Sequence, residues 1–460
     1  MNSVYNPLFI SKILKTYLVD IDRLKKLNAE KLRKYQDRHL KKMIKFAYTV
    51  PLYHDKYKKA HIHPGDIKGI KDIKKLPVVS KEDIKKYYPN GIISSGTSKD
   101  KLIEVSTSGT TGKSLSIFVD TFDIVMGLFG YIRAIKEYGI NWRKDRLTII
   151  GDFAPNTAES GYIYKWLQPR LNFDFLFKNI QWLDTNDDPK SIIDKINKFK
   201  PDFIGGYVGM LGHLALLKEK GLGKDISPKY IASTGGVLDK YLRQFIENTF
   251  DAHLFDTYGT TETGPIAFEC NQGGYHVMSD LMYLEFLKNG EPVQSGEPGK
   301  LIITKLYGGG TPIIRYDAIN DIVAPSYDKC NCHLSGDLIE KIYGREDLSL
   351  LLPGGIELLP SSFAEIYSKV FYELKTNKIK DTHIIQHSLS KIEIQIVIDE
   401  KLRNEGPTVE QIFSLIRTGF QEKVGPDVKI TIKEVKKLEK RVARIVSKLD
   451  KSKFKINKYI

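Results

Sequence analysis

Residues 105–114 read VSTSGTTGKS, a run of serines, threonines and glycines that contains one lysine, Lys113. Strand-like residues precede the run and follow it at Leu115–Val119, so we expect it to connect two strands. A Walker loop would lead into a helix and would keep four residues between its first glycine and its Gly-Lys pair, and this run does neither. Backbone N–H groups, hydroxyls and a lysine are nevertheless the groups that can surround a polyphosphate. The run therefore predicts a phosphate-binding loop.

The composition is that of a folded protein. The chain has 460 residues, of which 41% are hydrophobic and 28% charged, which excludes disordered and fibrous classes. Its formal net charge of +15 is concentrated at the two ends: residues 1–90 hold 22 basic and 9 acidic side chains and residues 429–460 hold 12 and 3, which leaves −7 for the residues between them. No nucleic-acid motif accompanies the basic helical pattern at 21–49, so we interpret this charge as solvated surface and expect no nucleic-acid partner.

The cysteine count is odd, with Cys270, Cys330 and Cys332 as the three. So small and odd a number fits no disulfide framework in a chain of this length, which favours a reducing compartment. No apolar run approaches the roughly 18 residues of a membrane-spanning helix, and residues 1–20 are not followed by the cleavage site of a signal peptide. We therefore expect a cytoplasmic protein with no membrane span.

Strand-like runs alternate with helical patterns over much of the chain, which predicts parallel strands in an α/β core. The runs 281–286 and 300–306 are instead expected to form antiparallel structure, with a turn around Asn289-Gly290. Beyond Gly344 a further set of strands and a helix predicts a second, α+β domain. The strand-like runs are 102–105, 147–150, 203–204, 230–233 and 253–255, the helical patterns 121–138, 189–199 and 239–249, and the elements of the second domain 350–352, 361–372, 391–398 and 428–432.

Four motifs, in this order, resemble those of the adenylate-forming superfamily, which includes the acyl- and aryl-CoA ligases. STSGTTGK at 106–113 resembles its phosphate loop and YGTTE at 258–262 its Y-G-x-T-E motif. RYDAIND at 315–321 is similar to its R-Y-x-x-x-D region, and GRED at 344–347 to its G-R-x-D hinge. Within the superfamily, the segments 76–83 and 312–316 resemble the phenylacetate-CoA ligase branch, which also contains capsule-biosynthesis proteins and enzymes that adenylylate a deazaflavin cofactor.

The resemblance implies an α/β fold in two parts. A large composite N-terminal AMP-binding domain, residues 1–345, would combine parallel-rich sheets flanked by helices with antiparallel β structure, and its residues 1–90 would be the basic helical region. A small, mobile α+β lid, residues 346–460, would rotate about a hinge near Asp347 between the two half-reactions. The resemblance also allows a homodimer.

The reaction that the resemblance implies begins with ATP-dependent activation of an aryl or acyl carboxylate to an acyl-adenylate, followed by thioester formation with CoA. The chain would then be an AMP-forming acid–thiol ligase that uses ATP, Mg²⁺ and CoA and acts on a small-molecule carboxylate. Two alternatives stay open. One is an adenylyltransferase that acts on a hydroxyl, or a carrier-protein loader without CoA; the other is a catalytically weak nucleotide-binding relative.

The same motifs imply roles for single residues. Thr261 would contact the α-phosphate, and Glu262 would bind Mg²⁺, a hard cation that prefers oxygen ligands. Tyr258 would offer its ring to adenine, and Asp321 would accept both ribose hydroxyls. This segment is one residue longer than the branch pattern, so Asp317 stays an alternative. The other nucleotide-binding residues would be Ser108, Gly109, Thr110, Thr111, Gly112, Lys113, Gly235, Gly236, Asp256, Gly259, Thr260 and Arg345.

The sequence departs from the family near its C-terminus. Relatives place a catalytic lysine in a Gly-Lys pair, where it bridges the carboxylate and the α-phosphate, and alignment on residues 445–447 puts Lys440-Arg441 at that position. Three interpretations stay open: Lys440 acts after a one-residue shift, Arg441 substitutes for the lysine, or adenylation is weak. Arginine keeps the charge but not the compact geometry of an ammonium group. Arg345 and Asp347 have an alternative too, as a simple salt bridge in a turn.

The cysteines suggest a metal site. Cys270 and His276 follow the YGTTE motif, and Cys330 and Cys332 follow the RYDAIND motif. Such a set from two loops fits a structural, tetrahedral Zn²⁺ of the Cys₃His type, and some members of the branch carry a comparable set. The Cys-x-Cys spacing is tighter than usual, so free thiols are the alternative, and His333 could replace His276.

The acid substrate is left open by the sequence. Candidate walls of its pocket are Tyr131, Phe153, Tyr207 and Val208, which lie in segments that flank the nucleotide site in relatives. These side chains are apolar or aromatic, so they admit an aryl or a medium-sized acyl group without choosing between them.

Overall fold

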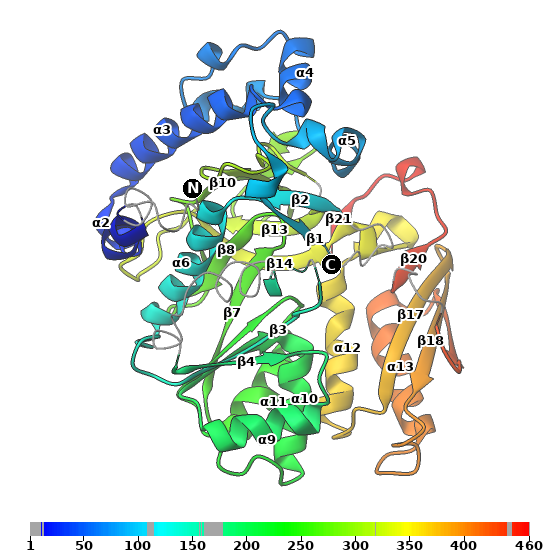
Figure 1. Cartoon of the computed structure of the whole chain (residues 1–460). Helices are drawn as coiled ribbons and strands as arrows, with labels where there is room; N and C mark the ends of the chain where they lie inside the picture. Colours follow the sequence, from blue (N-terminus) through cyan, green and yellow to red (C-terminus); the bar gives the residue numbers. More distant parts are fainter. Residues whose placement is uncertain are drawn as a thin grey trace.

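The computed structural model describes residues 11, 13–107, 115–155, 157, 159–160, 178–317, 319–438 and 444–459. In these residues the chain forms one large sheet with helices packed against it, a two-stranded sheet, and two small sheets near the C-terminus (Figure 1). The α/β class is as predicted. No helix in this part of the chain is long and apolar enough to cross a membrane.

One half of the large sheet is parallel, as the alternation of strand and helix patterns predicts. Helices cover one face, where Ile193, Phe245 and Leu254 belong to one buried apolar cluster. Phe255, the next residue along its strand, belongs to a second cluster with Ile124, because successive side chains of a strand point to opposite faces. The parallel strands are, in sheet order, β4 (Ile180–Asp184), β3 (Leu147–Gly151), β5 (Phe203–Tyr207), β6 (Tyr230–Thr234) and β7 (His253–Thr260), and the helices around them are α6 (Thr121–Glu137), α9 (Pro189–Phe199), α10 (Val208–Glu219) and α11 (Lys240–Phe250).

The other half of the sheet is antiparallel and begins where the chain reverses after β7. Gly264, with φ of +73°, starts the next strand directly after the turn 261–263, and that strand pairs with β7 itself. The predicted combination of parallel and antiparallel structure is present, and this tight turn joins both parts into one mixed sheet of 12 strands, a continuity that was not predicted. The antiparallel strands are, in sheet order, β8 (Gly264–Glu269), β9 (Tyr275–Val277), β14 (Leu338–Arg345), β13 (Asp321–Ser326), β12 (Gly299–Lys305), β10 (Met282–Lys288) and β11 (Glu291–Pro292).

The turn at Asn289-Gly290 forms where it is predicted. Asn289 has φ of +54° and Gly290 φ of +85°, the left-handed conformations that a two-residue hairpin turn needs. It joins β10 to the short strand β11, while β12 pairs with the other edge of β10. The antiparallel pairing of β10 with β12 is as expected.

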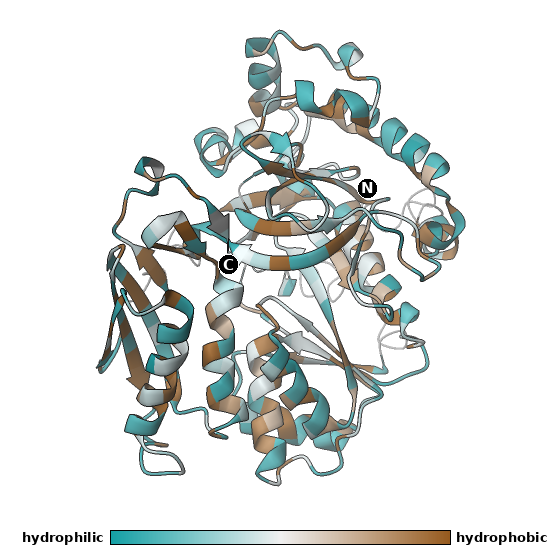
Figure 2. Ribbon diagram, turned by 180° about the vertical axis from the view of Figure 1, so that it is seen from behind, coloured by the Kyte–Doolittle hydropathy of each residue, from teal (hydrophilic) through white to brown (hydrophobic). Residues whose placement is uncertain are grey.

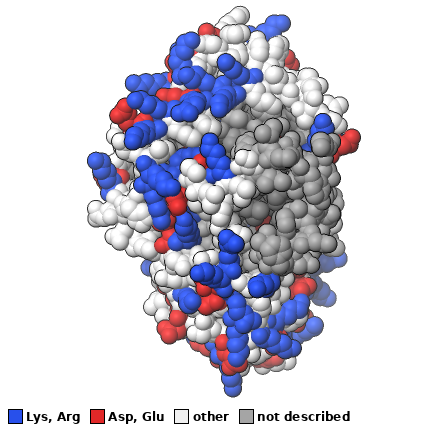
Figure 3. Space-filling model, turned by 60° about the vertical axis from the view of Figure 1, so that its left-hand side comes forward, with Lys and Arg blue, Asp and Glu red and all other residues white. Residues whose placement is uncertain are grey.

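The basic N-terminal region is helical. Its 21–49 pattern forms α2 (Arg23–Lys26) and α3 (Ala29–Ala47), and Asn28 caps α3 by accepting a hydrogen bond from the backbone of Lys31. The apolar face of α3 is buried and its charged face is exposed, so hydrophilic residues follow its outer side (Figure 2). Acidic side chains lie among the basic ones on the face drawn in Figure 3, which agrees with a solvated basic surface.

Two further N-terminal helices, α4 (Pro51–Lys59) and α5 (Lys81–Tyr87), pack against each other. Ser80 caps α5 in a reciprocal arrangement with Asp83. The strands β1 (Ile103–Ser106) and β2 (Ser116–Val119) form a separate antiparallel pair. They stand on either side of the predicted phosphate loop.

The C-terminal part holds two small sheets. Helix α12 (Pro360–Tyr372) packs between α11 and the second C-terminal helix, α13 (Val409–Val424), and Phe371 and Tyr372 contact the apolar cluster under α11. The side chains of Ser368 and Asp239 form a buried hydrogen bond across this contact. The elements are β15 (Leu350–Leu352), β16 (Ile356–Leu358) and β21 (Lys458–Tyr459) in one sheet, β19 (Lys429–Glu434), β18 (Lys391–Ile398), β17 (Ile379–Ser388) and β20 (Ile445–Ser447) in the other, and the helices α12 (Pro360–Tyr372) and α13 (Val409–Val424).

Candidate active site and metal centre

The carboxyl ends of the parallel strands meet at one edge of the sheet, which is the usual place for a ligand in an α/β fold. Thr234 ends β6 and Thr260 ends β7 at this edge, and the turn 261–263 follows. Asp321 begins β13 and Arg345 ends β14, and the two are cross-strand partners. Motif residues that are far apart in the sequence therefore lie close together in the fold.

Tyr258 and Asp321 form the most direct link between these segments. The Tyr258 hydroxyl donates a hydrogen bond to Oδ2 of Asp321. Burial raises the pKa of the Asp321 carboxyl to about 6, while the bond from Tyr258 acts in the opposite direction. The other oxygen, Oδ1, is not used in this bond. The alternative acid, Asp317, lies elsewhere, 3.6 Å from the Lys300 ammonium.

Glu262 is buried in the turn after β7, and burial raises the pKa of its carboxyl. The hydroxyl of Tyr316, a fully buried residue, donates to Oε1 of Glu262 over 3.2 Å. The hydroxyls of Thr260 and Thr263 lie 2.9 Å apart and tie the two ends of the turn together. Thr261 is the next residue in the same turn. A carboxylate held in this way is prearranged to meet a cation.

Two cationic side chains lie near these acids. The Arg345 guanidinium bonds both oxygens of Asp347, at 2.9 Å and 2.7 Å, and each of the two side chains is 29% exposed. Lys81, the first residue of α5, is partly buried, which lowers its pKa, as Arg345 also does, while the charge of Glu262 raises it. Lys81 has no predicted role, although it lies in the segment 76–83 that resembles the family branch.

The predicted glycines lie where backbones and rings come close. A Cβ at Gly235, where φ is +71°, would stand 2.4 Å from the ring of Tyr207, and one at Gly236 would stand 3.5 Å from Cβ of Val208. A Cβ at Gly259 would be 2.9 Å from a backbone oxygen of β8. The structure thus brings two predicted pocket residues, Tyr207 and Val208, next to the predicted glycine pair.

Asp256 is a buried residue of β7, two positions before Tyr258. Its carboxylate oxygens accept hydrogen bonds from the Ser233 hydroxyl, at 2.6 Å, and from the Tyr275 hydroxyl, at 2.8 Å. Burial raises the pKa of this carboxyl to about 6. Because both oxygens already serve protein donors, the structure gives Asp256 a role in joining strands, and its contact with a nucleotide stays a prediction.

Two groups of predicted residues lie outside the described part of the chain: the phosphate-loop residues Ser108, Gly109, Thr110, Thr111, Gly112 and Lys113, and the pair Lys440 and Arg441. The base of the phosphate loop is described. Ser106 pairs with Ser116 at the last register position of β1 and β2, and the Thr107 amide donates to the Leu115 carbonyl over 2.9 Å. The run therefore connects two antiparallel strands, as its sequence predicts.

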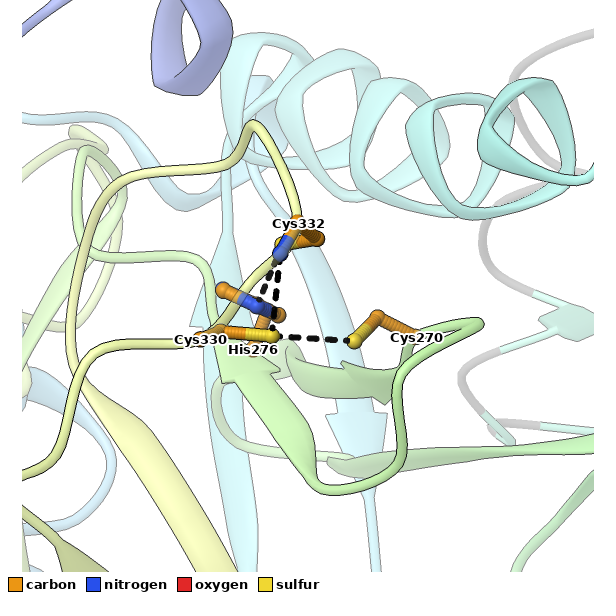
Figure 4. Close-up of side chains that lie close together, drawn as sticks. All are labelled: Cys270, His276, Cys330 and Cys332. Carbon is orange, nitrogen blue, oxygen red and sulfur yellow. Dashed lines mark hydrogen bonds between the residues drawn. The ribbon is translucent and has the colours of Figure 1, made fainter.

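The four predicted zinc ligands come together at a different place. Cys270 follows β8, His276 lies in β9, and Cys330 and Cys332 lie in the loop between β13 and β14 (Figure 4). One ligand atom from each side chain lies within 4.8 Å of all the others. The sulfurs of Cys270 and Cys330 are 3.7 Å apart, and Nε2 of His276 is 3.0 Å from the sulfur of Cys332.

This donor set fits zinc. Zn–S bonds of about 2.3 Å in a tetrahedron place two sulfurs about 3.8 Å apart, close to the distance between Cys270 and Cys330. Burial lowers the pKa of His276 to about 4, so its imidazole is neutral at pH 7, the form that binds metals. His276 is only 1% exposed and its Nδ1 has no hydrogen-bond partner among the described residues, whereas the His333 side chain is 66% exposed and lies beside Glu137. The described geometry thus selects His276 over His333.

The cluster and the candidate active site occupy opposite ends of β8. Gly264 starts the strand beside Glu262, and Cys270 follows its last residue. Six residues of antiparallel strand span roughly 20 Å. A metal held by Cys270 would therefore support the loops of the sheet and would not meet the nucleotide.

Comparisons with known proteins agree with this geometry. The chain is 26% identical over 378 residues to a phenylacetate-coenzyme A ligase of Escherichia coli (strain K12), with 78% of this chain and 82% of the relative covered. It is 22% identical over 429 residues to the ligase of the same name from Thermus thermophilus, with 89% and 93% covered, and 22% identical over 351 residues to Protein CapK of Staphylococcus aureus, with 75% of each covered. No family model matches the chain.

The fold is that of a solved ligase. A crystal structure of 2-hydroxyisobutyryl-CoA ligase in the postadenylation state, in complex with R3-HIB-AMP, superimposes with a TM-score of 0.71 at 17% identity and covers 95% of this chain and 91% of that one. The same ligase with 2-HIB-AMP and CoA in the thioesterification state gives a TM-score of 0.62 at 18% identity, with 92% and 91% covered.

Proposed function

Because the chain is a member of the adenylate-forming CoA ligase superfamily, with distant homology to phenylacetate-CoA ligases over most of its length, we propose that it converts a carboxylic acid to its CoA thioester at the expense of ATP. The observation that carries the proposal is the convergence at one sheet edge of Tyr258 and Glu262 from β7 and its turn, Asp321 from β13 and Arg345 from β14. These are the motif residues that would bind the ribose, the adenine ring, the phosphates and the Mg²⁺ ion of ATP.

The first step is adenylation. An oxygen of the substrate carboxylate attacks the α-phosphorus of ATP, and the bond to the leaving pyrophosphate breaks, which gives acyl-adenylate. Asp321 would hold the ribose through Oδ1, the oxygen that does not accept from Tyr258, and Glu262 would hold a Mg²⁺ ion that neutralises phosphate charge. Lys81 and Arg345 lie near Glu262 and would add positive charge for the same phosphates.

The second step is thioester formation. The thiol of CoA attacks the acyl carbon, loses its proton, and AMP leaves with the electrons of the broken C–O bond. We propose residues 346–460 as the lid and Asp347 as its hinge, since residues 346–348 form a single 3₁₀ turn between β14 and β15. Any rotation must break or carry along the hydrogen bond of Ser368 with Asp239.

We expect Tyr258→Phe to raise KM for ATP by about tenfold, the usual cost of a lost hydrogen bond to a charged group. Asp321 must be ionised to accept the ribose hydroxyls, so activity should fall as pH drops through about 6. The bond from Tyr258 lowers this pKa, so its loss raises the pKa and moves the acid limb of the pH profile to higher pH. Steady-state kinetics of both proteins between pH 5 and 8 would check this; an unchanged limb contradicts the assigned contact.

The departure at Lys440-Arg441 keeps a second candidate open, a relative with weak adenylation. We expect one of Lys440→Ala and Arg441→Ala to slow pyrophosphate exchange by about 100-fold, the effect of losing a charge that stabilises the transition state. The same variant should form thioester from preformed acyl-adenylate at the normal rate. If neither variant slows adenylation selectively, the assignment of the catalytic cation to this pair is wrong.

For the cluster of Cys270, His276, Cys330 and Cys332 we propose a structural Zn²⁺. Its support is the mutual distance of the four ligand atoms and the neutral, buried imidazole. Four protein ligands leave no open position for water, and closing loops before β9 and before β14 with one ion stabilises that end of the sheet.

A further inference from the structure

A carboxylate lies among the aromatic walls of the candidate substrate pocket. Glu159 follows β3 in the sequence, and its Oε1 accepts a hydrogen bond from the hydroxyl of Tyr207, the last residue of β5. Tyr207 and Phe153 are walls that the sequence predicts for an aryl or acyl group. An aryl or acyl group without a polar substituent forms no hydrogen bond or ion pair with a carboxylate in this position. The proposed function therefore does not account for Glu159.

The contacts of Glu159 and Tyr207 place the Glu159 carboxylate at the edge of the sheet where the parallel strands have their carboxyl ends. A Cβ at Gly151, the last residue of β3, would stand 3.2 Å from Cγ of Glu159 and 3.2 Å from the ring of Phe153. The ring of Tyr207 covers Gly235 after β6. The carboxyl ends of three neighbouring parallel strands thus hold Glu159, Tyr207 and the glycine of the nucleotide site in a row. Glu159 lies one tyrosine side chain away from that glycine, where the far end of a small acid would reach.

The charge of Glu159 is poorly compensated. Burial raises its pKa, while the hydrogen bonds from the Tyr207 hydroxyl and from the backbone N–H of Glu159 itself lower it. The charge of Asp152 also raises it, and Asp152 itself accepts a hydrogen bond from the Asn186 amide over 3.1 Å. No lysine or arginine of the described residues forms an ion pair with Glu159. A partly buried carboxylate whose side-chain partner is a neutral phenol favours a cation that would complete it.

We propose that the acid substrate carries a protonated amine at the end remote from its reacting carboxylate, and that Glu159 binds this ammonium group while Tyr207 holds the Glu159 carboxylate in place. The inference rests on the proposed ligase function and deepens it from a carboxylic acid to an amino-substituted carboxylic acid. The reacting carboxylate would point to the nucleotide and the ammonium group to the carboxyl end of β3. Glu159 is then the residue that determines specificity, and Tyr207 is a positioning residue.

The test uses matched pairs of acids that differ only in the amine: hexanoate with 6-aminohexanoate, and phenylacetate with 4-(aminomethyl)phenylacetate. In ATP–pyrophosphate exchange, we expect the wild-type chain to favour the amine of at least one pair by about tenfold or more in kcat/KM, as a charge-assisted hydrogen bond allows. Glu159→Gln should remove this preference and leave exchange with the neutral acid unchanged or faster. Tyr207→Phe keeps the charge of Glu159 and should reduce the preference without removing it, because only the KM for the amine-bearing acid rises.

Isothermal titration calorimetry of the same acids, without ATP, separates this inference from the proposed function. Tighter binding of the amine to the wild-type chain, lost in Glu159→Gln, supports the inference even if no acid gives exchange, in which case the ligase function alone fails. Equal or tighter binding of the neutral acid overturns the inference. The inference is also overturned if Glu159→Gln weakens the binding of both acids of a pair equally. It is overturned as well if an analogue with a hydroxyl in place of the amine binds as tightly as the amine, because the site then recognises a hydrogen-bond donor and not a charge.

Discussion

Glu262→Gln should reduce ATP–pyrophosphate exchange by about 100- to 1000-fold, the loss measured when one preorganised group that stabilises transition-state charge is removed. The amide has the shape of the carboxylate but cannot neutralise a divalent cation. Glu262 is buried and accepts a hydrogen bond from Tyr316, so the wild-type side chain is already fixed where the phosphates would lie. The midpoint of thermal unfolding should stay close to that of the wild type, because burial raises the pKa of this carboxyl and a neutral amide relieves that cost.

Glu30→Gln is the matched control, since its side chain is 73% exposed and forms an ion pair with the exposed Lys34 on α3. An exposed pair of this kind contributes about 0.5 kcal/mol at most. The control should exchange pyrophosphate at the wild-type rate. If the Glu262→Gln protein keeps more than about half of the wild-type exchange rate, the proposed role of Glu262 in binding Mg²⁺ is wrong.

Cys270→Ser should lose the bound zinc and much of the local stability. We expect about one equivalent of zinc in purified wild-type protein and less than about half an equivalent in the variant, because a hydroxyl is a poor substitute for a thiolate. Loss of a structural metal is one of the few single changes with a large effect, so the midpoint of thermal unfolding should fall by about 5 °C or more. Metal analysis and calorimetry measure the two effects on the same samples.

Two histidines provide the control for the metal site. His276→Ala removes a buried residue of the cluster and should lose zinc as Cys270→Ser does. His333→Ala changes a side chain that is 66% exposed, and it should keep the full zinc content. The opposite result, with zinc kept by His276→Ala and lost by His333→Ala, would replace His276 by His333 as the fourth ligand.

Local patterns gave much of the fold. The helix α9 spans Pro189–Phe199 as predicted, because proline at its first position and an apolar face mark it in the sequence. The strands β15 and β18 have the predicted bounds as well. The continuity of the mixed sheet was not predicted, since it depends on which strand β8 joins after the turn at 261–263, and pairing partners leave no local signal.

The site was predictable in its motifs and not in its contacts. The hydrogen bond between Tyr258 and Asp321 joins residues 63 positions apart, and the local sequence around either residue does not predict it. Lys81 and Glu159 lie in segments without a recognised charge motif, and only folding brings Lys81 near Glu262 and Glu159 to Tyr207. The metal cluster is the exception, because cysteine and histidine are the usual zinc ligands and four of them in two loops can be identified from the sequence alone.

ATP–pyrophosphate exchange by the wild-type chain over a panel of aryl, acyl and amino-substituted carboxylic acids tests the proposed function most directly. Exchange reports reversal of adenylation, so it needs neither CoA nor a known acceptor. The account predicts exchange that depends on Mg²⁺ and on the added acid, with at least one acid of the panel active. Binding of ATP without exchange for any acid would contradict it and would leave a nucleotide-binding protein that does not activate carboxylates.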